Sequence, residues 1–78
     1  MNLNEYYQTS DIALSAAISL FIPLDSIDNS NPTRAIFIFK RDEGIDKIIE
    51  NYWKNTLRVD PQAYFNKLKN LKTRLREY

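Results

Sequence analysis

The residues whose type and spacing suggest chemistry are basic side chains near the C-terminus. Residues 58–78 hold six basic residues against two acidic ones, a local balance of +4 in a chain whose net charge is +1. On a helix, basic residues three and four positions apart form one row, which can contact the phosphates of a nucleic acid. The candidate nucleic-acid-binding residues are Lys67, Lys69, Lys72, Arg74 and Arg76. The row itself comprises Lys69, Lys72 and Arg76.

A second interpretation of these cations stays open. Long basic side chains can lie along the edges of an apolar helix face and keep it solvated, and cations near a helix C-terminus are favourable in any case. Under that interpretation the domain binds a protein partner instead, through Trp53, an aromatic strand or the apolar side of the last helix. We expect a small binding module, with nucleic acid as the first candidate partner.

Catalytic chemistry finds little support in the sequence. The chain has no Cys and no His, which excludes the usual zinc sites, cysteine nucleophiles and histidine acid–base groups. The densest carboxylate group is Asp42, Glu43 and Asp46, which favourable placement at a helix N-terminus explains. A single glycine cannot build a phosphate-binding loop. We therefore expect no enzyme activity, no metal and no cofactor.

The segment Arg34–Arg41 alternates aromatic and aliphatic residues. As a strand it places Phe37 and Phe39 on one face and Ile36 and Ile38 on the other. If the aromatic face were open, it would resemble a base-stacking platform. We favour a sheet whose two faces are both buried by helices.

Three helices and a β-hairpin are expected to position these groups. Thr9 or Ser10 can cap a first helix that is apolar nearly all round, over residues 12–20. The polar stretch 28–33 then predicts a hairpin loop between strands 22–27 and 35–40.

Two further helices follow the hairpin. Asp42 predicts a helix start near Glu43, and Asp60-Pro61 predicts a last helix to about Glu77. The fold class is therefore α+β, with the order α-β-β-α-α and a β-hairpin packed with three helices. The apolar face of the last helix consists of Tyr64, Leu68, Leu71, Leu75 and Tyr78.

An ordered set of residues runs through nearly the whole chain, from about residue 6 to residue 76. It consists of Tyr7, Thr9-Ser10-Asp11, Leu14, Ala16-Ala17, Ile36-Phe37-Ile38-Phe39, Tyr52-Trp53, Val59-Asp60-Pro61, Tyr64 and Leu71-Lys72 with Arg74. Together these residues resemble a family of small bacterial, archaeal and phage domains of unknown function. The resemblance implies the architecture but no chemistry.

The length of 78 residues predicts one domain over 1–78, with loose order at residues 1–8. The apolar run 12–24 is too short to span a bilayer, and no targeting segment is visible, so we expect a cytoplasmic protein without membrane contact. The apolar face of the last helix exceeds what a small core can cover, so we also expect a homodimer.

Overall fold

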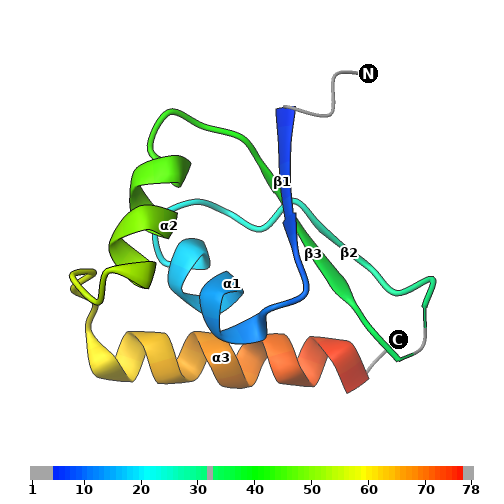
Figure 1. Cartoon of the computed structure of the whole chain (residues 1–78). Coiled ribbons are helices and arrows are strands. Elements are labelled where there is room, and N and C mark those ends of the chain that lie inside the picture. The colour runs from blue at the N-terminus through cyan, green and yellow to red at the C-terminus, as the bar shows by residue number, and fades with distance from the viewer. Residues whose placement is uncertain (1–4, 32, 77–78) are drawn as a thin grey trace.

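Three helices and a three-stranded antiparallel sheet make up the fold. The computed structural model describes residues 5–31 and 33–76 (Figure 1). The element order is β1 (Tyr6–Thr9), α1 (Ile12–Ser19), β2 (Ser26–Asp28), β3 (Ile36–Lys40), α2 (Ile45–Trp53) and α3 (Pro61–Arg76). The α+β class and the order of the last five elements are as predicted.

The strand β1 was not expected, because residues 1–8 were predicted to be loosely ordered. Residues 6–9 instead pair antiparallel with β3, with Tyr7 opposite Phe39 and Thr9 opposite Phe37. The reason is that β3 is the middle strand of the order β1-β3-β2, and its second edge offers backbone partners that the hairpin leaves free. Tyr7 also packs on the core, which anchors the strand.

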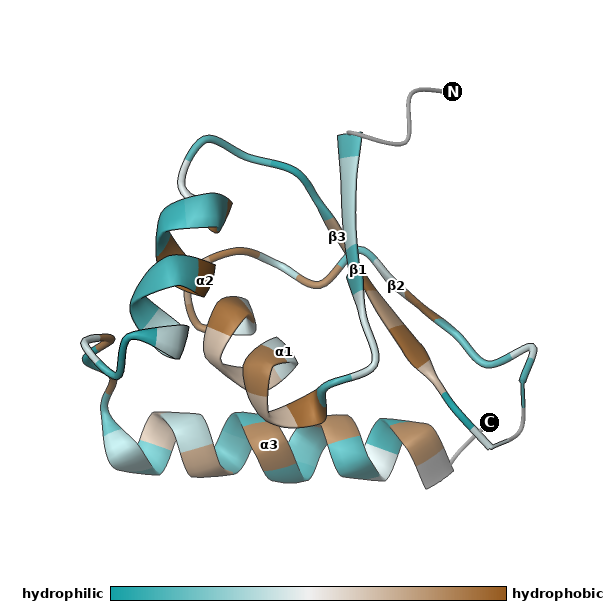
Figure 2. Ribbon diagram, in the orientation of Figure 1, coloured by the Kyte–Doolittle hydropathy of each residue, from teal (hydrophilic) through white to brown (hydrophobic). Residues whose placement is uncertain are grey.

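Helix α1 lies at the centre of the fold, as its sequence predicted. Leu14, Ala16 and Ile18 are fully buried, and Figure 2 shows hydrophobic residues along most of the helix. The predicted cap was wrong by one or two residues. Asp11 is the N-cap, because its Oδ1 accepts a hydrogen bond from the Leu14 amide at 3.1 Å, while Thr9 Oγ1 accepts one from the Asp11 amide.

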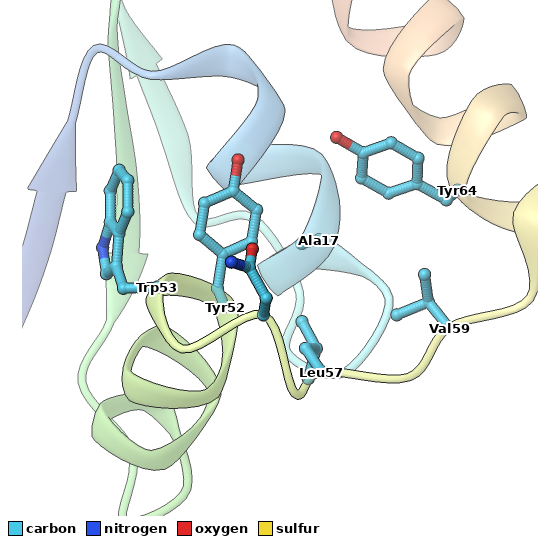
Figure 3. A pocket seen from close by; sticks show the side chains of 7 residues that line it. Ala17, Tyr52, Trp53, Leu57, Val59 and Tyr64 are labelled. Carbon is cyan, nitrogen blue, oxygen red and sulfur yellow. The ribbon is translucent and has the colours of Figure 1, made fainter.

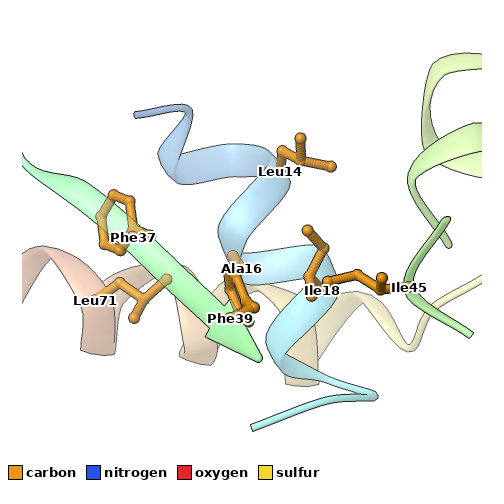
Figure 4. Packing of buried hydrophobic residues seen from close by; sticks show 7 residues of the cluster. All are labelled: Leu14, Ala16, Ile18, Phe37, Phe39, Ile45 and Leu71. Atoms are coloured by element: carbon orange, nitrogen blue, oxygen red, sulfur yellow. The ribbon is translucent and has the colours of Figure 1, made fainter. Parts of the chain in front are cut away.

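Each helix contributes to one core (Figure 4). Buried side chains from α1 meet Ile45 of α2, Leu71 of α3 and the two phenylalanines of β3. The prediction that helices bury both faces of the sheet is wrong. Phe37 and Phe39 are buried, but Ile36 and Ile38 are half-buried and do not pack against this core, since all three helices lie on the phenylalanine side.

The last helix begins where the sequence predicted. Asp60 Oδ2 accepts a hydrogen bond from the Ala63 amide at 2.8 Å, and Pro61 is the first helical residue. The start of α2 was predicted too early. Asp42 accepts from the Gly44 amide in a turn, and the helix begins only at Ile45.

The apolar face of α3 packs inward. Leu71 is buried, and Tyr64, Leu68 and Leu75 pack against the core, while Tyr78 lies outside the described residues. The Tyr64 hydroxyl donates to the Ala13 carbonyl at 3.1 Å, which ties α3 to α1. Within the described part of this face, Leu71 is thus covered completely and Tyr64, Leu68 and Leu75 are half-buried. No helix within the described residues is long and apolar enough to cross a membrane.

Candidate nucleic-acid interface

The predicted basic residues lie on two sides of α3. Lys69 and Lys72 are exposed on one side, and Lys67 and Arg74 are half-buried on the opposite shoulder of the apolar face. Arg76 ends the helix, and its side chain lies outside the described part of the chain. The structure thus brings together Lys69 and Lys72 but does not join them to Lys67 and Arg74.

No acidic residue competes for these cations on their own helix, because residues 61–76 contain none. Among the side chains that the structure describes, the ion pairs are Arg41–Asp46 and Lys54–Glu50, both at 2.6 Å. The described cations of α3 therefore pair with no described carboxylate. Their charge is available to an anionic ligand.

Phe65 is a residue that the sequence analysis missed. Its side chain is 58% exposed, and the Lys69 ammonium lies 5.3 Å from the centre of its ring, within the range of a cation–π contact. Lys69 and Lys72 are four and seven positions after Phe65, on the same side of α3. We call Phe65, Lys69 and Lys72 the α3 patch. The signal that could have revealed Phe65 is its place one residue beyond Tyr64, off the apolar face.

The alternative platform on β3 is excluded by burial. Phe37 and Phe39 are 1% and 0% exposed, so neither ring can stack on a base. Among the described residues, no group of three or more acidic side chains converges in a way that could hold a metal ion. Asp42 instead accepts a hydrogen bond from the Gly44 amide in a turn, and Asp46 forms an ion pair with Arg41.

Trp53 is exposed at the C-terminal end of α2. Its side chain is 63% exposed, and the Tyr52 ring contacts it edge-to-face with centroids 5.1 Å apart. It borders a pocket of about 440 Å³ between α1, the turn after α2 and the start of α3 (Figure 3). We call this the Trp53 pocket. Its lining residues are Ala17, Tyr52, Trp53, Asn55, Leu57, Val59 and Tyr64.

Two tyrosines in the Trp53 pocket have raised pKa values. Burial raises the pKa of Tyr52, and the nearby carboxylate of Asp11 and the Tyr64 phenol raise it further. Burial, followed by Asp11, likewise raises the pKa of Tyr64. These shifts move both phenol pKa values further from neutral pH than the ordinary tyrosine value, so both hydroxyls are protonated donors there. The Tyr64 hydroxyl already donates a hydrogen bond to the Ala13 carbonyl.

Comparison with known proteins bears on the family but not on the chemistry. No curated protein matches the chain, and no solved structure does. Residues 4–77 match the family described as "Domain of unknown function (DUF5659)". This match covers nearly the whole chain and agrees with the resemblance seen in the sequence, so the chain belongs to the DUF5659 family.

Proposed function

We propose that this domain is a non-enzymatic module that binds single-stranded nucleic acid through the α3 patch. The observation that carries the proposal is an exposed aromatic ring in line with two exposed lysines on a helix without acidic residues. Proteins that bind single strands combine these two features: a cationic surface that follows the nucleic-acid backbone, and aromatic rings on which bases stack.

The charge of α3 argues for phosphate contacts that carry little sequence information. Lysine ammonium groups act as point charges toward phosphate oxygens, and nothing in the α3 patch offers paired hydrogen-bond groups to a base edge. Recognition by stacking on Phe65 accepts every base. The proposed ligand is therefore single-stranded DNA or RNA of mixed sequence.

Charge reversal tests the proposal. We expect Lys69→Glu with Lys72→Glu to abolish binding of a mixed-sequence single strand, measured by fluorescence anisotropy at about 50 mM salt and micromolar protein. The neutral variant Lys69→Gln should still bind, with the log–log salt slope reduced by about one.

The matched control reverses the same amount of charge elsewhere. Lys40 and Lys47 are exposed at the end of β3 and on α2, outside the α3 patch. Lys40→Glu with Lys47→Glu should bind nearly as the wild type does. If both double variants lost affinity equally, the loss would come from the net charge of the protein and not from the α3 patch. Absence of binding by the wild type would refute the proposal.

A protein partner, including a second copy of this chain, is the other candidate function. It is favoured by the exposure of Trp53 and of Phe21, which is 51% exposed after α1. If these side chains serve a homodimer, sedimentation equilibrium at tens of micromolar will show a species of twice 9.2 kDa. A monomer under those conditions would remove self-association and leave only a different protein as partner.

A further inference from the structure

We infer that the Trp53 pocket takes one unpaired nucleobase of the strand that the α3 patch binds. This inference rests on the proposed function and adds a second contact to it. Its starting point is position. Tyr64 lines the pocket and Phe65 begins the α3 patch, so the two features adjoin at consecutive residues.

The lining of the pocket suits a neutral, planar group. None of its seven lining residues is charged, and three of them are aromatic. Its volume of about 440 Å³ falls within the usual range of about 300–1,000 Å³ for ligand pockets. A phosphate would find no cation among these residues, whereas a base would find apolar walls. The basic α3 patch therefore suits the charged phosphates of a nucleic acid, and the uncharged pocket suits its neutral bases.

Polar groups at the pocket can contact the edge of a base. The Asn55 side-chain amide offers both donors and an acceptor, and the Tyr52 hydroxyl offers a donor. The Tyr52 and Tyr64 rings come from different helices, with Ala17 of α1 behind them (Figure 3). Because Tyr64 already donates to Ala13, the polar side-chain groups left to donate to a ligand are those of Tyr52, Asn55 and the Trp53 indole.

The rim of the pocket is held in place before any ligand arrives. Asn55 adopts a left-handed backbone conformation with φ of 61°, and its amide donates to the Tyr52 carbonyl. The amides of Thr56 and Leu57 both donate to the Asn51 carbonyl, which closes the turn. The Tyr52 and Trp53 rings pack at right angles, and the indole is 63% exposed, which leaves indole surface free for a stacked base. Such preorganisation lowers the entropic cost of binding.

Intrinsic fluorescence provides a direct test, because Trp53 is the single tryptophan of the chain. A single-stranded oligonucleotide should change the Trp53 emission over the same concentrations that raise the anisotropy of the labelled strand. An abasic oligonucleotide of equal length is the matched ligand. It should still bind through its phosphates, more weakly, and leave the emission unchanged.

A variant pair completes the test. Trp53→Ala should weaken binding of the normal oligonucleotide by about 5- to 150-fold, the effect of losing one stacked base, and should leave the abasic one unaffected. Phe21→Ala, which removes another exposed aromatic ring outside the pocket, should alter neither affinity. Neither residue is buried, so both variants should fold.

The outcomes separate this inference from the proposed function. Binding that leaves Trp53 emission unchanged and survives Trp53→Ala would overturn the base-binding pocket while the α3 patch stands. An emission change that the abasic strand also produces would overturn it too, because no base is then needed. Absence of any binding would overturn both proposals. A side chain of a protein partner would then be the candidate ligand of the Trp53 pocket.

Discussion

Replacing Ile18 by Asp should abolish the cooperative thermal unfolding of this domain. Ile18 is 0% exposed in the middle of the core, and no basic side chain is among the residues of that core. An unpaired carboxylate there costs several kcal/mol, and domains of this size rarely have more than about 5 kcal/mol of stability. Circular dichroism during heating is the measurement.

The matched control lies three residues further along the chain. Phe21 follows the same helix but is 51% exposed, so Phe21→Asp places the same charge in water. This variant should retain a cooperative transition near the wild-type temperature. A cooperative, near-wild-type transition for Ile18→Asp would show that α1 is not at the centre of the fold.

Truncating two phenylalanines to alanine should separate structure from binding. Phe39 is fully buried in the core cluster, which holds residues of all three helices, so Phe39→Ala should lower the free energy of unfolding by about 3–5 kcal/mol. Phe65 is mostly exposed, so Phe65→Ala should change it by no more than about 0.5 kcal/mol. Urea unfolding measures both values.

The binding readout should show the opposite pattern. Phe65→Ala should weaken binding of a single strand while leaving stability unchanged, because Phe65 contributes a stacking surface and no core contact. A large loss of stability in Phe65→Ala would instead identify Phe65 as a structural residue. The α3 patch would then be reduced to its two lysines.

Local signals in the sequence predicted the elements that depend on local physics. Asp60-Pro61 specifies a helix start through one side-chain hydrogen bond and one restricted backbone angle, and both are present. The run of apolar residues in α1 predicted its burial equally well. Such features can be predicted without knowing which segments of the chain contact one another.

Two local predictions, the cap of α1 and the start of α2, were wrong by one or two residues. The larger misses depend on contacts between segments that are far apart in the sequence. Strand β1 has only four residues and owes its order to β3, some thirty positions away, so no local pattern marks it. The incomplete burial of Ile36 and Ile38 depends on which face of the sheet the helices pack against. The candidate interface was predicted in part. The lysines of α3 follow from the charge of the segment, whereas Phe65 was missed although its place one residue beyond Tyr64, off the apolar face, is a local signal.

The central position of β3 also sets an order of events during synthesis. The segment that becomes β1 leaves the ribosome before β3, since its partner strand is made only after the hairpin loop has been translated. Until then β1 has no edge to join, and the sheet closes through a contact of long sequence separation, which is slow to form. Removing residues 6–9 would turn β3 into an edge strand with unpaired backbone groups, the kind of edge that recruits other chains. β1 thus takes the edge position itself, as a strand of only four residues, and keeps the longer β3 inside the sheet.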